Sequence, residues 1–433
     1  MFRLVKTHVG KVIGDLYVFR VDDVETKYFE ALWYIPEGIT YNAYLLIGDK
    51  VVLFDGWKGK YSDLLIDELS RVVDVKDIDY VVIHHMEQDH SGSLPKVLEA
   101  NGFKATVVAH PMVRGMIGSF YGIKPKFKVV KDGEVLKLGK YSLRFIYTPW
   151  LHWPETIVSY VEELGTLISC DVFGAYSIPR SLFDDELSKD ELGKYLDYAR
   201  KYVITVVGHY KDYIIKGIDK IKSLGLDIKV IAPAHGLIWR RESKVIVSKY
   251  VGWAEGKPKD KKVTVIYDSM YGYVKEAMEV LIGELVKVGA EVKVHAFTED
   301  SHPPVGDVLS DVADSRAIVV GVSTYEGGAF PEILRVAGLM AMKATYRKPV
   351  IIVTAYGWGG IATKQVKDLL TKAGYLLGKT RTTQFFTLPL CSLLNRSLPF
   401  FTNKTRTAGG VSSSLPGQNG HTASALSRSS TPT

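Results

Sequence analysis

Four potential metal ligands fall within six residues of this chain, directly after an apolar run that is typical of a buried strand. The segment VVIHHMEQDHSG contains the pattern H-x-E-x-D-H, formed by His85, Glu87, Asp89 and His90. If the strand ends at Ile83, the loop lies at a sheet edge, where alternate side chains point to one side and His90 is added from the next position. Two imidazoles and two carboxylates in this place predict a metal site at the end of a strand.

Three more candidate ligands follow similar apolar runs further along the chain. They are His152 after LRFIYTPW, Asp171 after TLISC and His235 after KVIAPA. A single histidine after a strand is usually structural, and Asp171 alone would be read as a turn cap. Their shared position favours another interpretation, in which four strand ends present donors along one rim of a sheet sandwich. His84 should point to the opposite face, where we expect it to pack or to support the ligands.

The donor types restrict the metal. Histidine and carboxylate without thiolate suit iron, manganese or zinc, and a second carboxylate where a zinc hydrolase would prefer histidine favours iron. Four histidines and three carboxylates would suit two metals that share one carboxylate. Three anionic ligands against two divalent ions leave a charge of about +1, which a bridging hydroxide would cancel.

A polar, lysine-rich segment over residues 254–262 separates this region from a second pattern. Beyond it the apolar runs VTVIY, EVKVHAF, AIVVGVS and PVIIVTAYG alternate with helix-like stretches. Strand and helix in turn predict a parallel, doubly wound sheet. At 433 residues the chain is long enough for two cores. We therefore expect one domain over residues 1–253, a linker over 254–262 and a second domain over 263–380.

Three loops at the carboxyl ends of the expected parallel strands carry the chemistry of a flavin site. The first opens a helix whose backbone amides and dipole can hold a phosphate, the second has two glycines that allow close backbone approach, and the third offers aromatic faces for a flat ring. The dinucleotide fingerprint G-x-G-x-x-G does not follow the first strand, so FMN is the expected ligand. The loops contain Ser269, Met270, Tyr271, Gly272, Tyr273 and Val274; Thr324, Tyr325, Glu326, Gly327, Gly328 and Ala329; and Ala355, Tyr356, Gly357, Trp358, Gly359 and Gly360.

Together these motifs resemble those of the flavodiiron proteins. The resemblance rests on H-x-E-x-D-H-S-G, SCDVFGA, IAPAHGLIWR, GITYNAYLL, LFDDE, SMYG and AYGWGG, and it covers residues 1 to about 380. It implies an α/β protein in which an N-terminal metallo-β-lactamase-like αββα sandwich with a di-iron centre is followed by a flavodoxin-like doubly wound parallel sheet. It also implies that dioxygen is reduced to water, or nitric oxide to nitrous oxide, with electrons passing through FMN to iron.

The resemblance further implies ligand roles and partners. In this family a head-to-tail homodimer places the flavin of one subunit beside the irons of the other, and dimers of dimers are also expected. Rubredoxin, a flavin reductase or a reduced deazaflavin would each serve as the electron donor. Both gases use the same metal ligands, so the choice between them stays open. One iron would be held by His85, Glu87 and His152, the other by Asp89, His90 and His235, and Asp171 would bridge them.

Three residues depart from the family pattern in the flavin loops. After SMYG the family usually has a small polar residue and then threonine, but Tyr273 and Val274 stand here, so a phosphate-binding hydroxyl is lost. Glu326 stands where the family tends to have a neutral amide. These changes predict weaker FMN binding.

The resemblance ends near residue 378, where a last strand and helix are expected. Residues 381–433 are atypical, and the final stretch is rich in Ser, Thr, Gly and Pro. We expect this tail to be largely disordered. A frame-shifted end and a docking extension both fit that composition. Without a fifth strand the parallel sheet would have an uncovered edge.

Composition bounds the function classes. Cys170 and Cys391 are the only cysteines, too few for a disulfide framework, a rubredoxin-type site or an iron–sulfur cluster, so such an electron carrier would be a separate protein. Without an apolar run long enough to span a bilayer or a secretory cleavage site, we expect a cytoplasmic protein. The net charge of +7 does not indicate nucleic-acid binding. Short lysine runs indicate solvated surface or a docking face for an acidic redox partner.

Two rival functions remain at this point. A zinc-dependent metallo-hydrolase would use the same scaffold with a metal-bound hydroxide, but Glu87 and the appended flavin domain disfavour it. A non-catalytic or impaired flavin-binding homologue is the other, and Tyr273, Val274 and the tail favour it, whereas the complete set of seven ligands does not.

Overall fold

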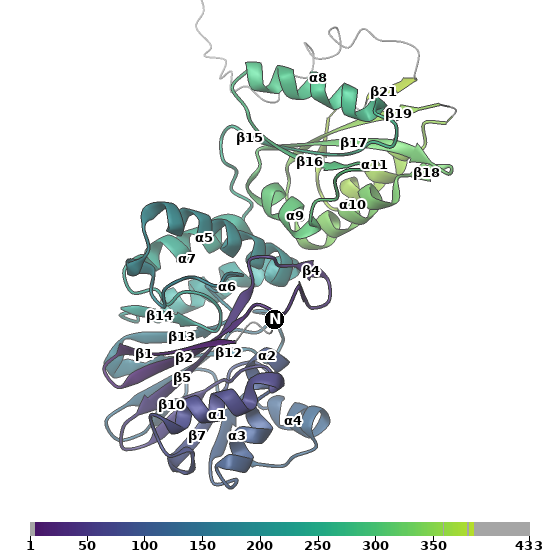
Figure 1. Cartoon of the computed structure of the whole chain (residues 1–433). Coiled ribbons are helices and arrows are strands. Elements are labelled where there is room, and N and C mark those ends of the chain that lie inside the picture. Colours follow the sequence, from purple (N-terminus) through teal and green to yellow (C-terminus); the bar gives the residue numbers. More distant parts are fainter. Residues whose placement is uncertain (1–4, 358, 379–380, 385–433) are drawn as a thin grey trace, which may run out of the picture.

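The computed structural model describes residues 5–357, 359–378 and 381–384. Its N-terminal domain has two sheets packed face to face between two layers of helices (Figure 1). The first sheet contains, in spatial order, β1 (Lys6–Ile13), β2 (Leu16–Asp23), β5 (Ile39–Ile47), β6 (Val51–Phe54), β7 (Ile78–Ile83), β8 (Thr106–Ala109) and β9 (Lys126–Val129). The second contains β10 (Val135–Lys137), β11 (Ser142–Tyr147), β12 (Ile157–Val161), β13 (Thr166–Cys170) and β14 (Val230–Pro233).

Helices cover the outer face of each sheet, and a small hairpin of β3 (Tyr28–Phe29) and β4 (Trp33–Tyr34) projects beside them. The layer against the first sheet contains α1 (Ser62–Ser70), α3 (Leu94–Ala100) and α4 (Val113–Tyr121), with α2 (Gln88–Ser91) at its end. The layer against the second sheet contains α5 (Lys189–Tyr202), α6 (Lys211–Ser223) and α7 (Ser243–Ala254). Single turns are η1 (Gly59–Tyr61), η2 (Val75–Asp77), η3 (Glu162–Leu164), η4 (Asp184–Glu186) and η6 (Gly208–Tyr210), and η5 (Val203–Val207) is a π-helix.

Coverage on both faces explains why the central strands are apolar almost throughout. Every residue of β12 and β13 is buried, as is nearly all of β5. The edge strand β1 instead contains polar residues that remain partly or fully exposed. Between the sheets lies a continuous apolar layer that includes Phe54, Phe145 and Ile168. This layer fixes the strand ends that carry the predicted ligands.

The C-terminal domain is a parallel sheet with α8 (Tyr273–Lys287) on one face and three helices on the other (Figure 1). Its strand order is that of a doubly wound sheet, which confirms the predicted fold class. In spatial order the sheet contains β16 (Glu291–Phe297), β15 (Lys262–Asp268), β17 (Ala317–Tyr325), β19 (Pro349–Tyr356) and β20 (Leu376–Leu377), with β18 (Gly328–Ala329) paired to β17. The three helices are α9 (Val305–Asp314), α10 (Pro331–Lys343) and α11 (Ala362–Lys372).

The sheet does not end at β19. Both β20 and β21 (Arg381–Gln384) pair with it in parallel, so the expected fifth strand is present and the sheet continues beyond the boundary predicted at residue 380. The predicted tail after Gln384 lies outside the described residues, as does Trp358 of the third loop.

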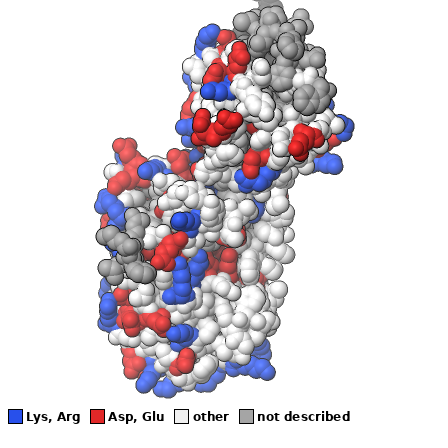
Figure 2. Space-filling view, turned by 45° about the vertical axis from the view of Figure 1, so that its right-hand side comes forward, with Lys and Arg blue, Asp and Glu red and all other residues white. Residues whose placement is uncertain are grey.

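The two domains are joined by a short segment between α7 and β15, and α9 and α10 of the C-terminal domain pack against α5, β4 and η6 of the N-terminal domain. Within the described ranges, no helix has the length and apolar character needed to cross a membrane. On the face shown in Figure 2, acidic and basic side chains of the described residues are interspersed over both domains.

Candidate metal centre and cofactor cavity

The predicted ligands lie at the ends of strands. β7 ends at Ile83, before the histidine-rich loop, and His152, Asp171 and His235 follow the ends of β11, β13 and β14. The first cluster differs from the predicted geometry in one respect. Asp89 is not part of an extended, alternating segment, because α2 begins directly after Glu87. The first two ligands of the cluster therefore come from a loop and the next two from one helical turn.

One half of the centre is formed by His85, Glu87 and His152. The Glu87 Oε2 atom lies 2.9 Å from His152 Nε2 and 3.3 Å from His85 Nε2. Both histidines also face Asp171, whose Oδ2 atom lies 3.8 Å from His85 Nε2 and 3.9 Å from His152 Nε2. Two imidazoles and a carboxylate thus converge on one side of Asp171.

The other half is formed by Asp89, His90 and His235. The Asp89 carboxylate lies 3.7 Å from His90 Nε2 and 3.6 Å from His235 Nε2. The same two nitrogens lie 3.2 Å and 3.1 Å from Asp171 Oδ1. Asp171 therefore faces one group with each carboxylate oxygen, and the structure brings all seven predicted ligands together around it.

The buried carboxylates of the centre are placed so that bound cations would stabilise them. Both carboxylate oxygens of Asp89 are buried without a hydrogen-bond partner among the described residues, which is costly for an isolated carboxylate. Burial and the nearby Glu87 raise the pKa of Asp89. Burial also acts to raise the pKa of Asp171, but His90 and His235 outweigh it and hold that pKa well below its usual value. The donor set and the unpaired carboxylate fit a two-metal site.

Outer contacts orient two of the histidines. His85 Nδ1 lies 3.1 Å from Glu155 Oε1, and His235 Nδ1 lies 2.8 Å from the backbone oxygen of Thr40. Burial would lower the pKa of His85, but hydrogen bonds to Glu155 and Glu87 raise it to about 9. A contact at Nδ1 leaves Nε2 directed at the centre, which is the arrangement that metal-binding histidines usually show.

His84 is directed away from the ligands. Its Nδ1 lies 2.7 Å from Asp55 Oδ2, and its Nε2 lies 2.8 Å from Ser159 Oγ. All three side chains are buried, so they link the first sheet to the second beneath the centre.

Two residues of the centre were not found from the sequence. Tyr202 donates a hydrogen bond of 2.7 Å to Asp171 Oδ1, and Glu155 supports His85. Tyr202 closes an amphipathic helix whose pattern gives no sign of a polar role. Glu155 lies three residues after His152, a spacing that could have drawn attention to it.

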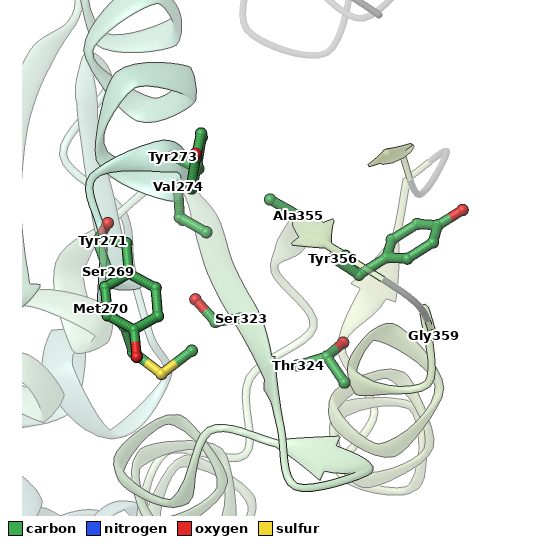
Figure 3. A pocket seen from close by; sticks show the side chains of 11 residues that line it. Ser269, Met270, Tyr271, Tyr273, Val274, Ser323, Thr324, Ala355, Tyr356 and Gly359 are labelled. Atoms are coloured by element: carbon green, nitrogen blue, oxygen red, sulfur yellow. The ribbon is translucent and has the colours of Figure 1, made fainter. Parts of the chain in front are cut away.

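A cavity of about 280 Å³ lies at the carboxyl ends of β15, β17 and β19 (Figure 3). All three predicted loops reach it, and Ser323, which was not predicted, also lines it. Its predicted lining residues are Ser269, Met270, Tyr271, Tyr273, Val274, Thr324, Ala355, Tyr356, Gly357 and Gly359. The predicted residues outside the lining are Gly272, Tyr325, Glu326, Gly327, Gly328, Ala329 and Gly360.

The first loop has the geometry of an anion site. Gly272 has a φ of +91°, and the helix α8 begins at the next residue, so its N-terminus opens toward the cavity. The hydroxyl of Ser269 accepts hydrogen bonds from the backbone N–H groups of Gly272 and Lys275. Val274 is buried at the cavity wall beside Tyr273, which is half exposed (Figure 3). A flat ring with a phosphate group fits these features.

Comparison with known proteins gives consistent results. Residues 39–236 match a family described as ODP family beta lactamase. A nitric oxide reductase of Moorella thermoacetica is 33% identical over 363 residues, which cover 84% of this chain and 89% of the relative. A mutant flavo di-iron protein from Thermotoga maritima superposes with a TM-score of 0.87 at 38% identity, covering 92% of this chain and 99% of that one. A rubredoxin oxygen:oxidoreductase from Desulfovibrio gigas gives 0.84 at 28% identity, covering 91% and 99%.

Proposed function

Because this chain belongs to the flavodiiron protein family, we propose that it is an oxidoreductase that reduces dioxygen to water, nitric oxide to nitrous oxide, or both. The observation that carries the proposal is the buried convergence of seven histidine and carboxylate side chains on Asp171, at the ends of four strands. Bound iron would supply electrons and open coordination positions to the gas, and bound FMN would supply electrons to the iron.

The side chains have distinct roles in this proposal. His85, Glu87 and His152 would hold one iron, Asp89, His90 and His235 would hold the second, and Asp171 would be shared between them. Glu87 has 21% of its side chain exposed, more than any of the other six ligands. The carboxylate of Glu87 therefore marks the side from which a gas molecule would approach. Trp153 lies with its ring centroid 4.8 Å from that of His85 and helps to exclude water from the buried side.

FMN is proposed to occupy the cavity at the ends of β15, β17 and β19. The N-terminus of α8 would hold its phosphate, and Tyr271 and Tyr356 would offer ring faces to the isoalloxazine. We also propose a first domain over residues 1–253, a linker over 254–262 and a second domain that begins at 263 and extends past residue 380 to include β21, since α7 ends at Ala254, β15 begins at Lys262 and β21 pairs with β19.

The proposed assembly is a head-to-tail homodimer, alone or paired into a dimer of dimers. Within one chain, the main contacts between the domains are made by α9 and α10, whereas the cavity lies at the loops beyond β15, β17 and β19. A second subunit could bring its cavity to the metal centre. The proposed electron donor is a separate protein or cofactor such as rubredoxin, a flavin reductase or a reduced deazaflavin.

Metal and flavin content test the proposed function directly. Protein purified without oxygen is expected to contain about two iron ions, because seven ligands with one shared carboxylate provide two sites, and about one FMN. The measurement is metal analysis together with the flavin spectrum of the released cofactor. Zinc without flavin would contradict the proposal and support the hydrolase alternative. Iron without flavin would indicate an impaired cavity.

A threonine in place of Val274 is expected to tighten FMN binding about tenfold, because a hydroxyl would gain a hydrogen bond to a charged phosphate. Val274 is buried at the cavity wall in the first turn of α8, so the change is nearly isosteric. The dissociation constant is measured by titrating the chain, freed of flavin, with FMN. Val280→Thr, the same change further along α8, should leave the constant unaltered. Equal affinity of Val274→Thr and the unaltered chain would show that the lost hydroxyl does not limit binding.

A further inference from the structure

Three consecutive residues at the end of α5 connect the C-terminal domain to the metal centre. Arg200 and Lys201 contact α9, whereas Tyr202 donates its hydrogen bond to Asp171. The three residues lie within one helical turn, so a displacement of the first two would be transmitted to the third through the helix backbone. All three are buried.

The Arg200 guanidinium is held by the C-terminal half of α9. Its Nε donates to the backbone oxygen of Ser310 at 2.9 Å and to the hydroxyl of the same residue at 3.0 Å. Its Nη1 atom donates a hydrogen bond of 2.9 Å to Asp314 Oδ2. A planar guanidinium with several donors engaged fixes both the distance and the orientation of its partner.

The Lys201 ammonium joins three segments. It lies 2.8 Å from Glu37 Oε1, in the loop after β4, and 2.8 Å from Asp307 Oδ1 on α9. Only 4% of the Lys201 side chain is exposed. A buried charge of this kind is tolerated only when its partners stay in place, so loss of one partner favours a shift of the lysine.

The backbone that follows is also fitted closely to α9. The hydroxyl of Thr205, in the π-helix η5, donates a hydrogen bond of 2.8 Å to the backbone oxygen of Lys201, in α5. A Cβ atom at Gly306 of α9 would lie 3.1 Å from Lys201 Cε and 3.4 Å from Thr205 Cγ2. Such contact leaves little space between the two helices. Single π-helical turns of this kind are frequent at functional sites.

We propose that α9 positions Tyr202, and through it Asp171, so that the C-terminal domain adjusts the metal centre of its own chain through the α5–α9 contact. Arg200, Lys201 and Asp307 are then positioning residues. The proposal rests on the metal centre proposed above. It differs from simple adhesion between domains, because adhesion would affect stability without altering the metal ligands.

The test uses Asp307, because it is half exposed, lies on α9 and belongs to the other domain. Asp307→Lys places a like charge beside Lys201. Full-length protein is loaded with Co²⁺ in place of iron, and the cobalt absorption bands and the Co²⁺ dissociation constant are measured. Partners of metal ligands typically contribute 10–100-fold to metal affinity, so we expect Tyr202→Phe to weaken binding about tenfold and Asp307→Lys about threefold, with shifted bands in both.

A double-mutant comparison separates the proposed route from a general effect. If α9 acts through Tyr202, adding Asp307→Lys to Tyr202→Phe causes little further change in the cobalt spectrum or affinity. Asp307→Glu, which keeps the carboxylate, should match the unaltered chain. Asp368→Lys, the same change at an exposed ion pair on α11, is the control. If Asp307→Lys does not fold, Asp307→Asn, which removes the charge without reversing it, takes its place in the test.

Two results would overturn the proposal. One is an unchanged cobalt spectrum and affinity in folded Asp307→Lys. The other is an effect of Asp307→Lys that is equally large with and without the Tyr202 hydroxyl. Failure of the unaltered chain to bind Co²⁺ would instead remove the metal centre on which the proposal rests.

Discussion

Replacing Asp171 with asparagine is expected to lower the rate of dioxygen or nitric oxide reduction by more than about 100-fold, beyond the range typical for partners of metal ligands. The physical reason is the position of Asp171 between the two ligand groups, with Oδ1 facing His90 and His235 and Oδ2 facing the first group. The asparagine amide has one oxygen and an NH2 group with two N–H donors, so it cannot offer an oxygen to each of two cations. Gas consumption with chemically reduced protein, together with iron per chain, measures the effect.

Asp184→Asn is a matched control for this variant. Both aspartates are 2% exposed and lie in the same domain. Asp184, however, lies outside the metal centre, where its carboxylate accepts hydrogen bonds from the backbone N–H groups of Arg240, Arg241 and Glu242. The control is expected to retain iron, FMN and activity. Iron content and gas consumption close to normal in Asp171→Asn would refute the bridging role.

The convergence of the seven candidate ligands could be predicted because each follows an apolar strand that ends at the same rim. His152, Asp171 and His235 are far apart in the sequence, yet the strand ends that carry them are recognisable from the preceding apolar residues. The doubly wound sheet was predictable for the same reason, since buried parallel strands are apolar and alternate with helices.

The short helix α2 could not be predicted, because it depends on contacts made after folding. A Cβ atom at Gly92 would lie 2.3 Å from the Gln88 backbone oxygen and 2.6 Å from the backbone nitrogen of Gly59, so the turn closes against a distant loop. Tyr202 was missed for a related reason. Its role depends on Asp171 lying next to α5, and helix periodicity carries no information about that neighbour.

Mixed dimers are expected to regain activity that neither parent variant has. One parent is Asp171→Asn, with an intact flavin cavity. The other is Ser269→Asp, whose added carboxylate at the N-terminus of α8 should repel the FMN phosphate and leave the metal centre intact. In a head-to-tail dimer, one of the two pairs of flavin cavity and metal centre is then complete. Purified mixed dimers should therefore reach about half of the normal rate per dimer.

The outcome depends on which cavity serves which metal centre. If each cavity served the centre of its own chain, neither chain of the mixed dimer would be complete, and the rate would stay at the level of the parents. We expect the mixed dimers to regain activity, because the contacts of α9 and α10 hold these helices, and not the cavity loops, against the N-terminal domain of the same chain. Two distinguishable affinity tags isolate the mixed dimer, and mixed dimers of Ser269→Asp with Asp171→Asn/Ser269→Asp, which lack both cavities, provide the control. Activity in that control would show that FMN still binds to the Ser269→Asp chain.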